Sequence, residues 1–456
     1  MTRKTFRKLL FTFAAITFLN LGWPNTILAD DDRIEALESR IAELEALVYT
    51  LLQQQQKTDE IIDAAALESV AADTAEAKVL SMMEEHRLEE LTEIRSTSYQ
   101  FGGYVKADIL YSDYSSGPVP SGSAGRDYYI PGTVPTGPAD STGYSYLDFQ
   151  AKESRLNFLA EHTTNGGDRL AALIEVDFLM SNSGDERVSN SYNPRLRQAF
   201  ITYNNWLFGQ TWVTFFNVSA LPENLDFVGP AESTIFGRQA MIRYSNGPWQ
   251  VALENPETTI TPYGGGVRIV ADSNHVPDAV LRYNFSGDGV TFSAAGILRQ
   301  LAIRNDAAGL DDTTTGYGIS LSGKFMLGAK DDFRWMASTG KGLGRYIGLN
   351  TANGAVLDER GELHAIRSTG LFGSYRHYWN DEWRSNLTLG YLAVDNPIEY
   401  TGTDVTRNAA SGHINLIYSP RPMLDFGIEF IYADRELESG DEGDLKRLQF
   451  SAKYAF

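Results

Sequence analysis

Two hydrophobic periodicities divide the chain near residue 98. Between residues 30 and 56, apolar residues recur at alternating steps of three and four, which is the heptad spacing of a helix that buries one stripe against partner helices. From residue 99 onward the period becomes two, so that apolar and polar residues alternate as they do in β-strands. The pattern therefore predicts a helical segment followed by a large β domain.

The heptad segment predicts self-association, because a single helix cannot bury such a stripe. β-Branched residues at the first heptad position, with leucine at the fourth, favour a dimer. Arg40-Ile41-Ala42-Glu43-Leu44-Glu45, in contrast, resembles a short motif of trimeric coiled coils in which the Arg and the last Glu pair between chains. These residues leave dimer and trimer open. The positions expected to carry oligomerisation are Ile34, Leu37, Arg40, Ile41, Leu44, Glu45, Val48 and Leu51.

The N-terminus is typical of a secretory signal. Four cationic residues within the first eight precede an apolar run over residues 9–21, and the small residue Ala29 stands at the expected cleavage position. We expect a signal peptide at 1–29, a periplasmic coiled coil at 30–56, a helical stalk or linker at 57–98 and a β domain at 99–456.

The alternation in the β domain is that of an outer-membrane barrel, whose strands need one apolar face for lipid and one polar face for the lumen. In the last strand Leu448, Phe450, Ala452, Tyr454 and Phe456 alternate with polar residues. A soluble sandwich would also alternate, but the signal peptide and the absence of a helical period favour the barrel. The fold class expected is an all-β transmembrane barrel of sixteen antiparallel strands with an N-terminal α-helical coiled coil.

Turn residues and polar stretches give the expected order of the strands. Compact turns such as Thr164–Gly167 and Ser245–Pro248 would lie at the periplasmic end, and long polar loops at the outer end. We expect long loops near 114–147, 180–194, 257–277, 303–313, 343–365, 396–407 and 435–444. The strands are expected to start near 99, 150, 168, 195, 205, 235, 249, 279, 290, 315, 332, 367, 383, 409, 423 and 445.

Many cationic residues fall on the predicted lumen face. Rings of Arg and Lys favour anions, which gain charge-assisted hydrogen bonds from them. The alternative is that these residues pair with lumen acids, for example Glu175 and Asp177, and only stiffen the wall. The residues placed inward by alternation are Lys106, Arg155, Arg195, Arg197, Gln239, Arg243, Arg282, Arg299 and Arg376.

The stretch 213–234 is more apolar than the other loops. An exterior loop would be wet, so its apolar residues indicate that it folds into the barrel and narrows it; the alternative is packing against a neighbouring subunit. The residues expected at this constriction are Leu221, Glu223, Leu225, Asp226 and Phe227.

Composition narrows the function classes. The 456 residues include no Cys, which excludes disulfide scaffolds and Cys-based zinc sites. A formal net charge of −20 argues against nucleic-acid binding. The six His residues lie in no recognisable motif, and no Gly-x-Ser-x-Gly occurs. We therefore expect no catalytic residues, no cofactor and no metal.

Charge also supports the boundary near residue 98. Residues 30–98 hold 18 acidic and 6 basic residues, whereas the much longer segment 99–456 holds 41 acidic and 29 basic residues. The excess of acid in the β domain weighs against an anion preference, although much of it lies in the loops.

Four motifs together resemble the DcaP-like outer-membrane porins. They are Phe101–Asp108, Arg238–Tyr244, Ala252–Thr258 and Val276–Tyr283. The resemblance implies a homotrimer of sixteen-stranded barrels with a periplasmic coiled coil, and passive uptake of small anions such as dicarboxylates. It also implies that Arg243, Arg282 and Glu254 line the channel. The stretch 57–95 is longer than the family leads one to expect.

The interpretation therefore is a porin in the outer membrane of a Gram-negative bacterium. Its expected partners are two further copies of the chain, outer-membrane lipid and lipopolysaccharide, and the barrel-assembly machinery through the terminal Phe456. The alternatives are a general or sugar-specific porin, and a porin whose coiled coil also tethers the membrane to peptidoglycan.

Overall fold

The structure, a computed structural model, describes residues 97–180, 187 and 189–456. The predictions of a signal peptide, a coiled coil and a stalk, with all their oligomerisation residues, lie outside the described residues. Among the residues described, no helix has the length and apolar character needed to cross a membrane.

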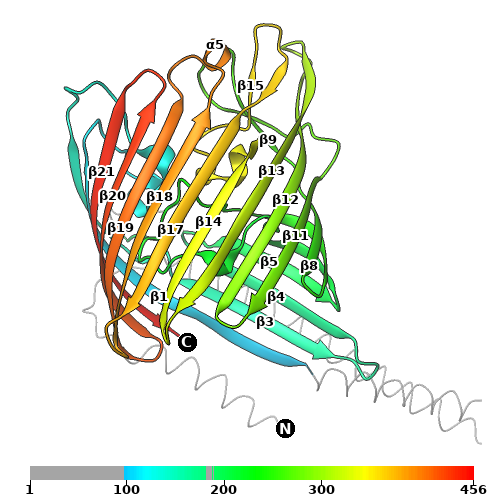
Figure 1. Cartoon of the computed structure of the whole chain (residues 1–456), viewed down its shortest axis with the longest axis vertical. Helices are drawn as coiled ribbons and strands as arrows, with labels where there is room; N and C mark the ends of the chain where they lie inside the picture. Colours follow the sequence, from blue (N-terminus) through cyan, green and yellow to red (C-terminus); the bar gives the residue numbers. More distant parts are fainter. Residues whose placement is uncertain (1–96, 181–186, 188) are drawn as a thin grey trace, which may run out of the picture. The chain divides into compact units, whose positions relative to one another are not determined.

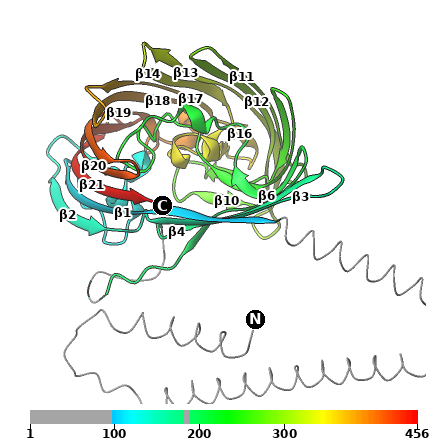
Figure 2. The same cartoon turned by 90° about the horizontal axis from the view of Figure 1, so that it is seen from below.

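Seventeen strands form one sheet that closes into a barrel (Figures 1 and 2). The strands are β1 (Ser98–Tyr114), β2 (Tyr144–Gln150), β3 (Arg155–Thr163), β4 (Arg169–Asp177), β5 (Arg195–Tyr203), β6 (Trp206–Trp212), β7 (Arg238–Asn246), β8 (Trp249–Glu254), β11 (Asp278–Gly287), β12 (Val290–Asn305), β13 (Leu310–Leu327), β14 (Asp331–Lys341), β17 (Arg367–Tyr378), β18 (Trp383–Asp395), β19 (Thr406–Arg421), β20 (Leu424–Leu437) and β21 (Glu442–Ala455).

The first strand closes the barrel by pairing on both edges. On one edge β1 pairs with β21 over Tyr104–Tyr114. On the other edge it pairs with β3 through its first half and with β2 through its second half. Because β2 and β3 are two parts of one wall position, interrupted at 151–154, sixteen antiparallel positions close the wall. A closed wall leaves no unpaired strand edge in lipid. The predicted sixteen-stranded barrel is confirmed.

Along each strand the apolar residues are exposed and the polar residues are buried, which is the reverse of the arrangement in a soluble protein. On β21, Leu448 and Phe450 face outward and are 46% and 43% exposed, whereas Arg447 and Gln449 face inward and are almost fully buried. Lipid would cover the apolar face of such a wall, and the polar face lines the interior.

The strand order follows the prediction closely, with three differences. The second wall position already begins at Tyr144, as β2, and not near residue 150. Two loops expected to be long are short, because β12 and β13 pair up to Asn305 and Leu310, and β20 and β21 pair up to Glu436 and Glu442. The strands extend into the polar stretches there, since backbone pairing continues irrespective of side-chain polarity.

Three long loops fold into the interior, and we name them by order. Loop 1 (residues 115–143) contains α4 (Ala124–Asp127) and η1 (Pro131–Thr133). Loop 3 (213–237) contains η2 (Val218–Ala220). Loop 6 (342–366) contains η3 (Gly344–Tyr346), η4 (Gly348–Asn350), β15 (Ala355–Leu357) and β16 (Leu363–Ala365).

Loop 4 (255–277) adds β9 (Thr258–Thr261) and β10 (Ile269–Ala271), which form a four-stranded sheet with β15 and β16. A short helix, α5 (Ile398–Thr401), lies in the loop between β18 and β19.

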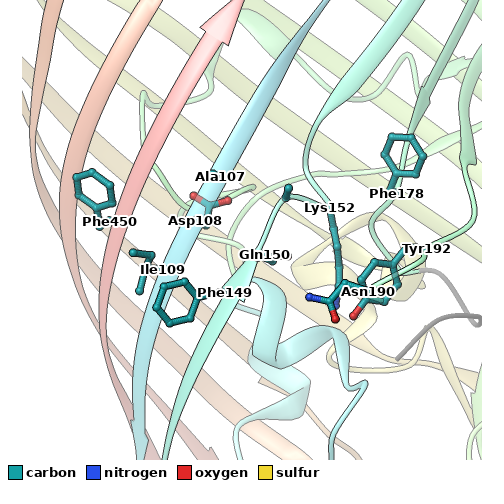
Figure 3. Close-up of a pocket in the computed structure, with 11 residues that line it drawn as sticks. Ala107, Asp108, Ile109, Phe149, Gln150, Lys152, Phe178, Asn190, Tyr192 and Phe450 are labelled. Atoms are coloured by element: carbon teal, nitrogen blue, oxygen red, sulfur yellow. The ribbon is translucent and has the colours of Figure 1, made fainter. Parts of the chain in front are cut away.

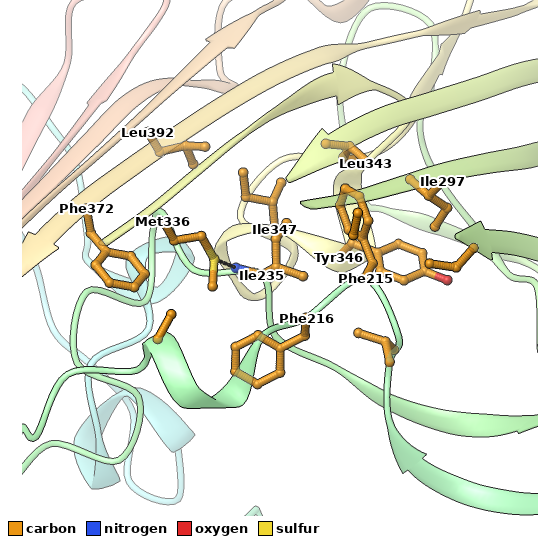
Figure 4. Packing of buried hydrophobic residues seen from close by; sticks show 14 of the residues in the cluster. Phe215, Phe216, Ile235, Ile297, Met336, Leu343, Tyr346, Ile347, Phe372 and Leu392 are labelled. Atoms are coloured by element: carbon orange, nitrogen blue, oxygen red, sulfur yellow. Dashed lines mark hydrogen bonds between the residues drawn. The ribbon is translucent and has the colours of Figure 1, made fainter. Parts of the chain in front are cut away.

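Loops 3 and 6 share an apolar core inside the barrel (Figure 4). Phe215, Phe216 and Ile235 of loop 3 pack with Tyr346 and Ile347 of loop 6. Inward-facing residues of the wall complete the cluster, among them Met336, Phe372 and Leu392. Besides the stretch 213–234, loop 6 buries an apolar segment that the sequence pattern did not single out.

Loop 1 forms a second core against the opposite part of the wall. Its Tyr129 and Val134 are buried with Val228 of loop 3 and with Ala433 and Leu445 of β20 and β21. Loops 1, 3 and 6 thus narrow the lumen from several sides.

Gly103 provides a test of how the pairing of β1 with β21 closes the barrel. It lies at the end of the β1–β21 seam, where its backbone exchanges hydrogen bonds of 3.1 and 3.0 Å with Phe456. A Cβ on Gly103 would lie 2.1 Å from the carbonyl oxygen of Arg155, whereas one on Gly166, in a turn, would meet nothing closer than 3.7 Å. We expect Gly103→Ala to destabilise the folded barrel by about 1–3 kcal/mol. Gly166→Ala should have little effect.

The measurement is the temperature at which the detergent-folded barrel loses its compact mobility on a denaturing gel. Equal midpoints for the two variants would contradict the closure argument.

Candidate functional site

Loop 3 lies against the inner face of the wall and is held there through its backbone carbonyls. Arg282 on β11 donates to the carbonyl of Phe216 at 2.7 Å. Lys106 on β1 donates to the carbonyl of Leu225 at 2.6 Å. Since β1 and β11 belong to different parts of the wall, the loop spans the interior of the barrel (Figure 2).

The N–H groups of the same loop are held by one buried carboxylate. Glu429 on β20 accepts hydrogen bonds from the N–H of Leu225 at 2.7 Å and from that of Asp226 at 3.3 Å. Asn415 and His413 on β19 contact the same carboxylate at 2.9 and 3.2 Å. Glu429 has no exposed surface. A buried carboxylate with this many donors ties the tip of loop 3 to the wall.

A second contact fixes Glu223 on loop 3. Arg384 and Arg376 donate to its carboxylate at 2.6 and 2.9 Å. Burial acts to raise the pKa of Glu223, but the two guanidinium groups outweigh burial and hold that pKa below its ordinary value. Glu223 therefore keeps its charge as part of an ion pair.

All five residues expected at the constriction lie on loop 3 within the barrel. Leu225 and Asp226 are buried against the wall, whereas Leu221, Glu223 and Phe227 keep partial contact with solvent.

Most of the cations expected to line the lumen are paired with carboxylates. Arg195 holds Asp177 through two bonds of 2.8 and 2.7 Å, and Arg197 reaches both Glu175 and Asp177. The other cations in ion pairs are Lys106 with Glu153, Arg155 with Glu175, Arg299 with Asp278, and Arg376 with Glu223.

Two of the expected cations have only neutral partners. Arg243 donates to the hydroxyl of Thr214 at 2.8 Å and to the carbonyl of Trp212. Arg282 donates to Asn284 at 2.6 Å and to Ser293 at 2.8 Å, besides its bond to loop 3. Within the described part of the chain, neither guanidinium forms an ion pair, so both charges remain uncompensated by direct contact.

Gln239 and Glu254 lie under the loops, at 5% and 1% exposure. Gln239 donates to Glu254 at 2.7 Å, and Glu254 accepts the N–H of Thr214 at 2.6 Å. Glu254 thus holds the start of loop 3, Gln239 also contacts Tyr346 and Arg345 of loop 6, and neither residue faces open solvent.

Alternation missed one further arginine, Arg238. Its guanidinium lies over the rings of Trp212 and Phe236, at 4.8 and 5.9 Å from the ring centroids. Its Nη1 atom is buried without a hydrogen-bond partner. Among the described residues it forms no ion pair. Arg238 is the first residue of β7. By strict alternation its side chain would face outward, but at the end of the strand this alternation is not followed.

One cavity in the described part of the chain does not belong to this site. It measures about 590 Å³ and lies at the break between β2 and β3 (Figure 3). Its lining includes Phe149 and Phe450, which are on the outward face of the wall. The cavity therefore opens toward the outer surface of the barrel.

Ser411, His413 and Glu429 form a hydrogen-bonded row that resembles a hydrolytic triad in its spacing, with distances of 3.1 and 3.2 Å. The hydroxyl of Ser411, however, donates a hydrogen bond to the carboxylate of Glu232 at 2.9 Å. Because the Ser411 hydroxyl is directed at Glu232, it is not donated to Nε2 of His413, and the row lacks the nucleophile-to-base hydrogen bond of a hydrolytic triad. The row is buried beneath loop 3 and is an anchor for it.

These features define a class of protein: an outer-membrane β-barrel whose lumen is narrowed by inward-folded loops. The model of the DcaP outer membrane protein family matches residues 35–456, so the chain belongs to that family. It is accordingly an outer-membrane β-barrel protein. No curated protein sequence matches the chain significantly.

Similar solved structures include one with the same fold and two that are more distant. The outer membrane channel DcaP of Acinetobacter baumannii is 20% identical, with 79% of this chain and 98% of that chain covered and a TM-score of 0.64. An anion-selective porin from Comamonas acidovorans is 13% identical, with 79% and 100% covered and a TM-score of 0.49. The trimer form of OmpT from Vibrio cholerae is 10% identical, with 79% and 100% covered and a TM-score of 0.47.

Glu232 of loop 3 gives a pH-dependent test of the anchor. Its hydrogen-bond donor, Ser411, is neutral, and burial raises the pKa of Glu232 to about 7. Because the folded pKa exceeds the unfolded one, stability is lost as pH rises from about 4.5 through about 7. Glu232→Gln removes this loss, which is on the order of 3 kcal/mol for a shift of about 2.5 units.

We expect Glu232→Gln to match the wild type in melting temperature near pH 5 and to exceed it near pH 8. Glu359→Gln, on an exposed part of loop 6, is the control and should follow the wild type at both values. A pH-independent difference between Glu232→Gln and wild type would refute the raised pKa.

Proposed function

We propose that the protein is a porin for the passive diffusion of small hydrophilic solutes, with a preference for anions such as dicarboxylates. The observation that supports the preference is the group of cations without carboxylate partners on one side of the lumen. We call this group, Arg238, Arg243 and Arg282, the cationic face.

The cationic face is built on neighbouring strands and on the start of loop 3. Arg238 and Arg243 lie on β7, and Arg282 lies on β11, with only β8 between these two strands. Arg243 and Arg282 also contact residues 212–217 at the start of loop 3. The three positive charges therefore lie beside the loop that narrows the lumen.

Local charge, rather than the total, governs which ions enter a pore. The six other cations expected on the lumen face each pair with a carboxylate, and the two charges of each pair offset one another. The cationic face has no such acid in contact among the described residues. A carboxylate that enters would gain charge-assisted hydrogen bonds there, whereas a cation would be repelled.

Two cations on separate strands also suit a solute with two carboxylates. The backbones of β7 and β11 are two strand spacings, about 10 Å, apart. The long side chains of Arg243 and Arg282 reach back toward the same part of loop 3, so two acid groups of one small molecule can each find a guanidinium.

We further propose a homotrimer, with the coiled coil in the periplasm. The wall over β3 to β8 is low, with strands of 6 to 9 residues. It presents Phe158, Ile174, Ile201 and Leu253 outward at 44 to 57% exposure. A low apolar wall is suited to packing against other copies, and the taller remainder to contact with lipid and lipopolysaccharide. The terminal Phe456 would be read by the barrel-assembly machinery.

The reversal potential of single channels in a salt gradient tests the preference. We expect the wild type to lie toward the anion equilibrium potential. Arg238→Gln, Arg243→Gln and Arg282→Gln should each move it toward the cation side, since each removes one uncompensated charge. Lys330→Gln is the control, because Lys330 lies in an exposed turn, and should leave the potential unchanged.

A cation-directed potential in the wild type would overturn the anion preference but leave the porin. The absence of any conductance from a correctly folded barrel would overturn the porin itself.

A further inference from the structure

The hairpin at the outer tip of loop 6 brings three potential metal ligands together. β15 and β16 pair with Leu357 opposite Leu363, so Asp358 and Glu362 flank the turn and His364 follows on β16. One ligand atom from each of the three residues lies within 4.8 Å of the others. The Oδ2 atom of Asp358 and the Nε2 atom of His364 are 3.1 Å apart.

The turn orients the carboxylate of Asp358. Its Oδ1 atom accepts the N–H of Arg360 at 2.8 Å and that of Glu362 at 2.9 Å. Both hydrogen bonds occupy one oxygen and leave Oδ2 directed at His364. The orientation is therefore set by the backbone of the hairpin and does not depend on a ligand.

The imidazole of His364 is also held. Its ring stacks on Tyr400 of α5, with ring centroids 4.8 Å apart and an interplanar angle of 28°. Nε2 remains on the side of Asp358. The carboxylate of Glu362 is exposed and makes no hydrogen bond or ion pair with any described residue, so it is available as a third ligand.

We propose that Asp358, Glu362 and His364 bind one divalent transition-metal ion of the Zn²⁺ type at the outer end of the barrel. One imidazole nitrogen with two carboxylate oxygens is a donor set that such ions accept. Mg²⁺ and Ca²⁺ prefer oxygen ligands throughout.

The spacing of the donor atoms fits this ion. Two ligands of a tetrahedral site with bonds of about 2.05 Å are about 3.4 Å apart. The 3.1 Å between Asp358 and His364 is close to that value, and Glu362 needs only a rotamer change at the surface.

Water has access to complete the coordination. His364 and Tyr400 line a polar cavity of about 730 Å³. Lys341 and Arg367 also line it, and their charges are matched by Asp395 and Glu399. The field in the cavity therefore does not exclude a cation.

The site is independent of the solute proposal and concerns the outer loops. Loop 6 is joined to loop 3 by the hydrogen bond from the N–H of Phe236 to the carbonyl of Tyr346 at 2.9 Å, and by their common core. A metal at the hairpin would stabilise the outer part of loop 6 without touching the cationic face.

Titration of the full, detergent-folded, tag-free chain with Co²⁺ and Zn²⁺ tests the proposal. We expect one equivalent of Co²⁺ to give the visible absorption of a bound ion, and Zn²⁺ to displace it. His364→Ala and Asp358→Asn should each weaken binding at least about tenfold, since each removes one of three protein ligands. His275→Ala, an exposed histidine of loop 4, is the control and should bind as the wild type does.

Heat-modifiable mobility on a gel confirms that each variant is folded before it is titrated. Binding that persists in folded His364→Ala would overturn the assignment, and so would the absence of a saturable equivalent in the wild type. In that case Asp358 and His364 form only a side-chain hydrogen bond. Channel selectivity is measured separately, so failure here leaves the porin proposal untouched.

Discussion

The interior of this barrel depends on one constraint, which is that the backbone of loop 3 must be hydrogen-bonded where it is buried. The contact between Glu429 and that backbone meets this constraint. A loop segment that is buried against the wall must find partners for its N–H and C=O groups, because buried polar groups without a hydrogen bond cost several kcal/mol each. Glu429 takes the N–H groups of Leu225 and Asp226, and Lys106 takes the carbonyl of Leu225. The first role of these charged wall residues is therefore to hold loop 3 in place.

This use divides the arginines into two groups. Those in contact with acids, such as Arg195 with Asp177 and Arg376 with Glu223, build the wall and fix loop 3. Their charges cancel within a few ångströms, so they contribute little to the field that a solute meets. The arginines that hold loop 3 through neutral atoms, or through aromatic rings as Arg238 does, leave charge available beside that loop. The net charge of the chain therefore gives no measure of pore selectivity.

The wall was predictable from the sequence because its signal is local. A period of two and turn residues at regular spacing suffice to place sixteen strands, and lipid demands that pattern on every strand. The interior was less accessible, because its contacts join distant residues. Glu223 meets Arg376 across 153 positions, and Tyr346 reaches Asp278 across 68. The alternation of apolar and polar residues predicts which face of the wall an arginine lies on. It does not predict whether an acidic side chain lies within reach of that arginine. Alternation did not identify Arg238 as an inward residue, since the first residue of this strand does not follow the alternation of the others.

The apolar cores of loops 1 and 6 escaped prediction for a related reason. Tyr128, Tyr129, Tyr346 and Ile347 lie in short irregular segments among glycines and prolines, where no period distinguishes a buried aromatic from an exposed one. They become a core only when two loops meet inside a closed wall. The same geometry separates the tip of loop 6 from the pore. The hairpin that carries Asp358 and His364 lies beyond this core, and loop 6 meets loop 3 through the β-bridge between Ile235 and Ile347 and through the side chains packed around it. Protein interiors have low compressibility and transmit strain, so this shared core is the route by which a displacement of the hairpin would reach the constriction.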